Sequence, residues 1–229
     1  MNVLKGKTAL VTGATGGIGR AIVYELSEAG CNVIVTGRDH TKLARLKAEV
    51  SGVADVYAAN LEDIGQLVSL CDQFRNRVDI LVNCAGVFIK KPIEDNMFFE
   101  YDQTMNLNVR APFFLTKYFG SGMVAKGWGR IVNIGSSSSY LGALDSAAYV
   151  TSKHALLGLS RATNREFRDK GVRVFCISPT STQTEIGRQV GGDYEKFLKP
   201  EDIAKYMVFA ISFDGELISD EVRLNRAIF

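Results

Sequence analysis

The stretch Thr8-Ala9-Leu10-Val11-Thr12-Gly13-Ala14-Thr15-Gly16-Gly17-Ile18-Gly19 joins a short apolar run to a turn that holds four glycines. The apolar run predicts a strand, and Ile18, Ile22 and Leu26 predict a helix with one buried face. Glycine permits a tight turn, lets the backbone approach a pyrophosphate and allows a helix to pack closely on a strand. Since a helix N-terminus also offers unpaired N–H groups to an anion, the stretch predicts dinucleotide binding. An ordinary strand-to-helix turn is the alternative, but such a turn does not usually need this many glycines.

Strand-sized apolar runs alternate with helical patterns along the rest of the chain. Further strands are expected at 32–36, 53–58, 79–83, 130–134 and 172–177, with a last extended stretch near 221–224. One helix is expected to run through Met105, Val109 and Phe113, and another over 200–212. Strands this apolar, separated by helices, are typical of a parallel sheet covered on both faces. The pattern predicts an α/β fold that is doubly wound and three-layered, with one domain over residues 1–229 and a mainly parallel sheet of about seven strands.

The composition argues against several kinds of protein. A net charge of +2 gives no reason to expect nucleic acid or an anionic membrane as a partner. The apolar runs are too short to span a bilayer, and the N-terminus lacks the apolar core of a signal peptide, so the cytoplasm is the expected location. The four cysteines lack metal-type or redox-type spacing and are expected to be small buried hydrophobes. With only two isolated histidines, no metal site is expected.

Tyr149 and Lys153 are four residues apart in a segment that predicts a helix. Residues at this spacing project from the same helical face, so the phenol and the ammonium share one small space. Asp145 or Ser146 is expected to cap this helix, which places Tyr149 in the first turn. A nearby positive charge and a helix N-terminus both favour the phenolate form, which suits a tyrosine that gives or takes a proton.

Several motifs in order resemble the short-chain dehydrogenase/reductase family. They are the turn at 12–19, Asn83-Cys84-Ala85-Gly86, Met105-Asn106-Leu107-Asn108-Val109-Arg110, the strand at 129–136, Tyr149-x-x-x-Lys153 and the loop at 179–184. The resemblance covers about residues 4–184 and is strongest toward 3-oxoacyl-carrier-protein reductases. It implies a Rossmann-type fold and an NAD(P)-dependent oxidoreductase.

The resemblance also implies the catalytic residues. Tyr149 matches the proton donor, and Ser136, thirteen residues before it, matches the serine that hydrogen-bonds the substrate oxygen. Lys153 matches the lysine that favours the phenolate and holds the nicotinamide ribose. Asn108 matches the asparagine that supports a proton-refilling water chain. The alternative for Ser136 is one of several serines in a turn, and the alternative for Asn108 is a polar helix residue without a catalytic role. Position in the shared pattern favours catalysis for both.

Cofactor contacts carry over from the same motifs. The residues expected to bind the dinucleotide are Gly13, Thr15, Gly17, Ile18, Gly19, Arg38, Asn60, Leu61, Asn83, Ala85, Gly86, Tyr149, Lys153, Pro179, Thr182 and Thr184. The end of the second strand decides between NADP(H) and NAD(H). Gly37 stands where NAD users of the family usually place Asp, and Arg38 can grip a 2′-phosphate in bidentate fashion. NADP(H) is therefore expected over NAD(H), although Asp39 directly after Arg38 could oppose a phosphate.

This chain departs from the family pattern at several positions. Thr180 replaces the usual Gly of the nicotinamide loop, which predicts an altered backbone there. Asn60 stands where an Asp commonly contacts the adenine, a role that Asn can also fill. Only a short polar stretch, 185–199, is available to cover the substrate, and the C-terminus lacks the family's usual segment.

The expected reaction is hydride transfer between NADP(H) and a carbonyl or secondary alcohol. The leading substrate is a 3-oxoacyl thioester, and the alternative is another small ketone, sugar or hydroxy acid. A non-catalytic dinucleotide sensor or scaffold is the rival from another class, although such a protein would not need Tyr149 and Lys153. The resemblance further implies a homodimer or homotetramer.

Overall fold

A seven-stranded parallel sheet forms the centre of the computed structural model, which describes residues 3–216 and 218–227. The strand order is β3-β2-β1-β4-β5-β6-β7, so the winding direction reverses between β1 and β4. The strands are β1 (Thr8–Thr12), β2 (Asn32–Gly37), β3 (Val53–Ala58), β4 (Ile80–Asn83), β5 (Gly129–Ile134), β6 (Val172–Pro179) and β7 (Glu221–Leu224). A reversal of this kind opens a crevice at the carboxyl ends of the strands, where doubly wound proteins bind ligands.

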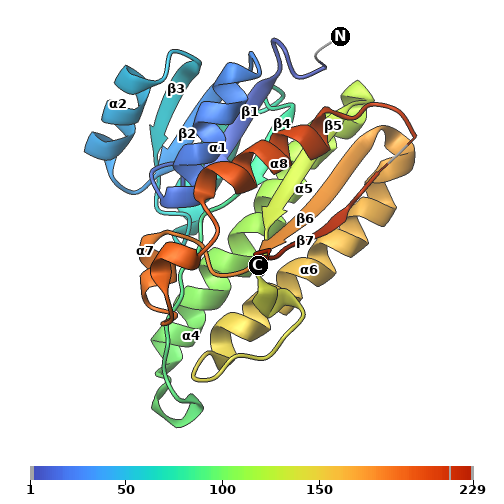
Figure 1. Ribbon diagram of the computed structural model, residues 1–229. Coiled ribbons are helices and arrows are strands. Elements are labelled where there is room, and N and C mark those ends of the chain that lie inside the picture. Colours follow the sequence, from blue (N-terminus) through green and yellow to red (C-terminus); the bar gives the residue numbers. More distant parts are fainter. Residues whose placement is uncertain (1–2, 217, 228–229) are drawn as a thin grey trace.

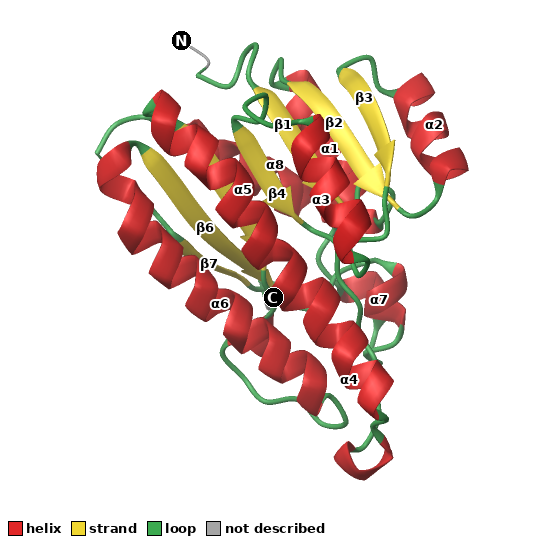
Figure 2. Cartoon of the chain, turned by 180° about the vertical axis from the view of Figure 1, so that it is seen from behind, coloured by secondary structure: helices red, strands yellow, loops and turns green. Residues whose placement is uncertain are grey.

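Helices cover both faces of the sheet. They are α1 (Gly17–Glu28), α2 (His40–Glu49), α3 (Ile64–Gln73), α4 (Phe98–Met105), α5 (Ala111–Lys126), α6 (Ala147–Phe167), α7 (Glu185–Arg188) and α8 (Pro200–Ser212). Figure 1 shows α1 and α8 across one face, and Figure 2 shows α5 and α6 across the other. The strand arrowheads in Figure 1 point toward the end of the molecule where α4 and α7 lie. In the part of the chain described, no helix has the length and apolar character to span a bilayer.

Strand residues alternate between two buried clusters. Val11 packs in the cluster that includes α1, α2 and α8, whereas its neighbour Leu10 packs in the cluster that includes α3 and α5. Val33 and Ile34 divide in the same way on β2. Successive strand side chains point to opposite faces, so a strand buried on both faces must be apolar throughout. This requirement explains why uninterrupted apolar runs predicted the strands. The three-layer fold with seven strands is confirmed.

The helix predicted through Met105, Val109 and Phe113 is present, but it is not α-helical throughout. A π-helical turn, Asn106–Arg110, separates α4 from α5, and the Ala111 N–H donates to the carbonyl of Asn106. Pro112 gives the physical reason, because it has no N–H to donate to the carbonyl of Asn108 four residues before it. Turns of this type occur frequently at functional sites.

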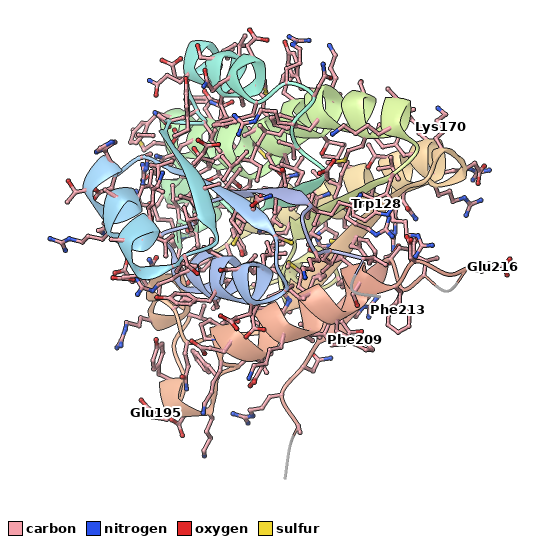
Figure 3. All side chains as sticks on the ribbon, turned by 90° about the horizontal axis from the view of Figure 1, so that it is seen from above. Trp128, Lys170, Glu195, Phe209, Phe213 and Glu216 are labelled. Atoms are coloured by element: carbon pink, nitrogen blue, oxygen red, sulfur yellow. The ribbon has the colours of Figure 1, made fainter. Side chains whose placement is uncertain are left out.

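The C-terminal end of α8 is held by Arg130, a side chain only 1% exposed. Its guanidinium donates to the carbonyls of Ile211 and Phe213, pairs with Asp214 at 2.6 Å and stacks over Trp128 at 4.5 Å. Figure 3 shows Trp128 and Phe213 at this end of α8. Since the last carbonyls of a helix have no partner within it, Arg130 supplies hydrogen bonds that α8 itself cannot make.

We expect Arg130→Met to lower the free energy of unfolding by about 2–4 kcal/mol, because it leaves the carbonyls of Ile211 and Phe213 and the Asp214 carboxylate without their donor. Urea denaturation of both proteins measures the difference. Asp214→Asn is the matched control and should cost less than about 1 kcal/mol, because Asp214 is half-exposed. An Arg130→Met midpoint within error of the wild type would contradict the role assigned to this side chain.

Candidate active site

A cleft of about 770 Å³ opens at the carboxyl ends of the strands, across the point where the strand order reverses. Its wall combines the turn after β1, the ends of β2 to β6, the N-terminal turn of α6 and the segment around α7. Segments far apart in the sequence meet at this cleft, because the carboxyl ends of parallel strands all lie at one edge of the sheet.

The glycine turn forms the floor of the cleft and is shaped by close backbone contacts. Gly13 has φ of +62°, and a Cβ on Gly19 would lie 2.2 Å from the Gly13 carbonyl oxygen. The N-cap of α1 is Gly16, which has no side chain to occupy the first N–H groups of the helix. This end of α1 therefore presents free donors and a positive helix dipole to the cleft, as an anionic pyrophosphate requires.

The end of β2 brings two cationic side chains to the same wall. Arg38 and Lys42 both line the cleft and are exposed. The carboxylate of Asp39 lies outside the lining and caps α2 by accepting from the Lys42 N–H at 3.0 Å. A capping aspartate places the residue three positions later in the first helical turn, so the sequence held a signal for Lys42 that was missed.

Helix α6 carries Tyr149 and Lys153 into the cleft. Ser146 is the N-cap, which puts Tyr149 in the first turn as predicted, although the Ser146 hydroxyl bonds to Leu144 and not to the helix. The Phe88 ring packs edge-on against Tyr149 with centroids 4.8 Å apart. The Lys153 ammonium is 5.6 Å from the Tyr149 ring centroid and donates to the carbonyl of Ile134 at 2.8 Å. Lys153 is only 7% exposed, so its charge acts in a poorly solvated space.

Ser136 follows β5 and lines the cleft with its hydroxyl only partly used. Its Oγ accepts from the Ser138 N–H at 3.1 Å, and its own N–H donates to the Ser139 hydroxyl. A hydroxyl holds one donor and two acceptor positions, and the bond from Ser138 fills one acceptor position. The O–H of Ser136 thus stays available to an oxygen placed in the cleft.

Asn108 lies behind the cleft wall and holds two segments together. Its amide exchanges hydrogen bonds of 2.9 Å with the backbone of Val87 and donates to the Ser152 hydroxyl on α6. A Cβ on Gly86 would lie 3.2 Å from the Asn108 oxygen, which is closer than ordinary contact, so glycine here leaves Asn108 in place. The π-turn that Pro112 produces carries this asparagine.

The structure brings most of the predicted site residues together around this one cleft. The lining includes Gly13, Thr15, Gly17, Ile18, Gly19, Arg38, Asn60, Leu61, Ala85, Gly86, Ser136, Tyr149, Lys153, Pro179, Thr182 and Thr184. Asn108 and Asn83 lie outside the lining. Asn83 is paired in register with Asn133 of β5 and donates to its side chain at 2.8 Å within the sheet.

Thr180 and the segment 185–199 are two departures from the family pattern at the cleft. Thr180 has no positive φ, and its N–H donates to Leu224 of β7, so this loop accepts a residue other than glycine without strain. The segment 185–199 is not wholly irregular, because α7 and a short 3-10 turn at Tyr194–Lys196 form within it. Residues of α7 line the cleft, and Tyr194 lines a smaller hollow beside Gly187 and Arg188.

The cysteines take no part in the chemistry of the cleft. All four are free, and Cys31, Cys71 and Cys176 are buried. Cys84 touches the cleft, but burial raises the pKa of its thiol to about 12, and the charge of Lys153 offsets this only partly. A thiol with such a pKa is not a nucleophile near neutral pH.

Comparison with known proteins identifies the family. The sequence profile of the short chain dehydrogenase family matches residues 7–195. The chain belongs to the short-chain dehydrogenases. It is 31% identical to an NAD-dependent glycerol dehydrogenase of Listeria innocua, with 94% of this chain and 90% of that protein covered.

Two solved structures are similar along nearly the whole chain. A candidate NAD(P)-dependent gluconate 5-dehydrogenase from Beutenbergia cavernae, with bound NADP, has a TM-score of 0.87 at 32% identity and covers 96% of this chain and 95% of its own. A candidate betaketoacyl-ACP reductase has a TM-score of 0.87 at 32% identity, with 97% of each chain covered. This short-chain dehydrogenase is therefore an oxidoreductase of a family that uses NAD(P).

The residues of the cleft fit such a dinucleotide. The glycine turn leaves room for a backbone-to-phosphate approach, and α1 supplies free N–H donors. Arg38 and Lys42 supply positive charge at the end of β2, where a dinucleotide of this fold class places its adenosine ribose.

Proposed function

We propose that this short-chain dehydrogenase reduces a ketone, or oxidises the matching secondary alcohol, with NADP(H). The observation that carries the proposal is that Ser136, Tyr149 and Lys153 line one wall of the cleft that also holds the glycine turn. A proton donor, an oxyanion donor and a cation then face the space beside the dinucleotide.

Each side chain has a role that its surroundings permit. The cofactor supplies or accepts the hydride at its nicotinamide ring when bound. Tyr149, its ring fixed against Phe88, exchanges a proton with the substrate oxygen. The free O–H of Ser136 donates to the same oxygen and stabilises the charge that develops on it. Lys153 has N–H groups beyond the one bonded to Ile134, and these would hydrogen-bond the ribose hydroxyls of the bound cofactor.

Asn108 acts behind these groups as a positioning residue. Its bonds to Val87 and Ser152 tie the segment after β4 to α6, which carries Tyr149. The Ser152 hydroxyl in turn donates to the Tyr149 carbonyl at 2.7 Å. This network supports the proposal that Asn108 maintains the path by which water returns a proton to the site.

The preference for NADP(H) is supported by charge at the end of β2. Arg38 and Lys42 line the cleft, while Asp39 lies outside the lining and caps α2. A 2′-phosphate would meet two cations there.

We expect Arg38→Asp to shift the cofactor preference toward NADH by at least about tenfold, because a charge-assisted bond worth about 1.5–3 kcal/mol is replaced by repulsion. The ratio of kcat/KM for NADPH and NADH measures the change in both proteins. Lys42→Met should shift the ratio in the same direction but less, and Lys47→Met, which removes a charge bonded to Ala54, should leave it unchanged. A wild type that prefers NADH would remove the proposed role of Arg38.

Two substrate classes are compatible with this chemistry. The similarity to a candidate betaketoacyl-ACP reductase supports a 3-oxoacyl thioester. The similarity to a glycerol dehydrogenase and to a candidate gluconate 5-dehydrogenase supports a small ketone, sugar or hydroxy acid. Oxidation of NADPH with a panel of 3-oxoacyl thioesters, simple ketones and oxo acids tests the function. Binding of NADPH without turnover of any carbonyl would favour a dinucleotide sensor.

We also propose that copies of this chain associate as a homodimer or homotetramer. Apolar side chains are exposed on α4 and just before it, with Phe98 at 93%, Ile93 at 74% and Phe99 at 66%. A cluster of this kind on a soluble protein marks a contact surface. Sedimentation velocity over a range of concentrations tests the association, and a monomer at the highest concentration would contradict it.

A further inference from the structure

The cleft holds one cation that the cofactor does not require. Its lining includes four cationic side chains, Arg38, Lys42, Lys90 and Lys153, and one carboxylate, Glu185. The first two lie at the end of β2 and the last is anchored on Ile134 beside Tyr149. Lys90 belongs to neither group, and within residues 3–216 and 218–227 its ammonium has no hydrogen bond or ion pair.

Alternate residues in the segment after β4 line the cleft, and this alternation places Lys90 on the substrate side. Gly86, Phe88 and Lys90 line the cleft, whereas the residues between them do not. The Phe88 ring is packed on Tyr149 with centroids 4.8 Å apart. An extended chain spans about 3.3–3.6 Å per residue, so the Lys90 backbone lies within about 7 Å of that of Phe88.

Neighbouring contacts hold this segment in place and leave the Lys90 charge free. The Lys91 N–H donates to the Asp145 carbonyl at 2.7 Å, just before α6, and the Lys91 ammonium pairs with Glu100 at 2.5 Å. Glu185 is not the missing partner of Lys90. It follows Thr184, whose methyl group would be 2.6 Å from a Cβ on Gly17, so it begins beside the glycine turn.

We infer that the substrate is a small oxo acid, or the matching hydroxy acid, whose carboxylate is bound by Lys90 while Ser136 and Tyr149 bind the reacting oxygen. The inference rests on the proposed function and narrows it to one substrate class. A lone lysine is a point charge suited to a monoanion, whereas a phosphate dianion usually draws several donors, and the next cation in the chain is paired with Glu100. Electrostatic complementarity of this kind fixes the orientation of the substrate and selects against neutral analogues.

The test compares linear oxo acids, with increasing spacing between carbonyl and carboxylate, against their methyl esters in the NADPH oxidation assay. The wild type should favour at least one acid over its ester by about tenfold or more in kcat/KM. Lys90→Met should lose this preference through a raised KM for the acid, with kcat and the rate on the ester within about twofold of the wild type. Lys91→Met is the matched control, because it removes the adjacent positive charge, which does not face the cleft, and it should retain the preference.

Each other outcome is decisive. Equal or better turnover of the esters by the wild type, or an acid preference that survives in Lys90→Met, overturns the inference and leaves the proposed function standing. Better turnover of a neutral 3-oxoacyl N-acetylcysteamine thioester than of any acid overturns it in favour of the thioester class. If the preference for a phosphorylated ketone over its unphosphorylated form exceeds the preference for an acid over its ester, the site is assigned to a dianion instead. Failure to oxidise NADPH with any carbonyl removes the proposed function, and the inference with it.

Discussion

The Tyr149→Phe protein should lose turnover by about 10²–10⁴-fold or more while keeping its affinity for NADPH. The substitution removes only the hydroxyl to which proton transfer is assigned. The ring stays in its site because the contact with Phe88 and the bond from Ser152 to the Tyr149 carbonyl do not involve the phenol oxygen. The measurement is steady-state NADPH oxidation together with a fluorescence titration of NADPH binding.

Tyr140→Phe is the matched control for this experiment. Tyr140 lies outside the cleft lining, and its hydroxyl bonds to Glu221 of β7. Its loss should leave kcat within about twofold of the wild type, since the hydroxyl that is removed bonds to Glu221 outside the cleft. Near wild-type turnover by Tyr149→Phe would contradict the proton-transfer role and direct attention to another donor in the cleft.

Lys153→Met should lower kcat/KM by about 10²–10³-fold and also weaken the binding of NADPH, because one ammonium is assigned to both the phenol and the ribose. The side chain is 7% exposed, so water cannot replace its charge within the wall of the cleft. Kinetics and the NADPH titration separate the two effects. The expected pattern differs from that of Tyr149→Phe, in which only turnover falls.

A structural role for Lys153 predicts a different pattern. The ammonium also donates to the carbonyl of Ile134 at the end of β5, so its loss could disturb the contact between α6 and the sheet. Urea denaturation of Lys153→Met detects such a disturbance. A variant that unfolds at the wild-type midpoint but has lost activity supports the assigned role, whereas wild-type activity in a folded variant contradicts it.

Much of the fold was predictable because it follows from short-range patterns. Strands buried on both faces need uninterrupted apolar runs, and the predicted range 79–83 agrees within one residue with β4, which is buried throughout. The predicted range 200–212 agrees with α8. The tight turn after β1 was evident from its glycines. The π-turn within the helix predicted through Met105 was not foreseen, because Pro112 acts on the carbonyl of Asn108, four residues away, and apolar periodicity does not register a missing N–H.

The candidate site was predictable to the extent that its residues belong to local motifs. Tyr149 and Lys153 share a helical face by their spacing alone. The family resemblance pointed to Ser136 and to the glycine turn, and the fold places both in the same cleft. The direction of individual side chains was harder to predict from the sequence. Asn83 belongs to a motif of the site, yet its pairing with Asn133 across β4 and β5 turns it into the sheet.

The sequence by itself determined the parallel α/β architecture, the glycine turn and the pairing of Tyr149 with Lys153, because backbone sterics and helical spacing act between residues close along the chain. Only the tertiary structure decided that the end of β2 and the glycine turn line one cleft, that Asn83 pairs with Asn133 within the sheet, and that Lys90 faces the cleft with no partner in the described part of the chain. Those facts depend on which strands lie side by side and on which way loop side chains turn. They are set by the packing of elements distant in sequence, which no local pattern encodes.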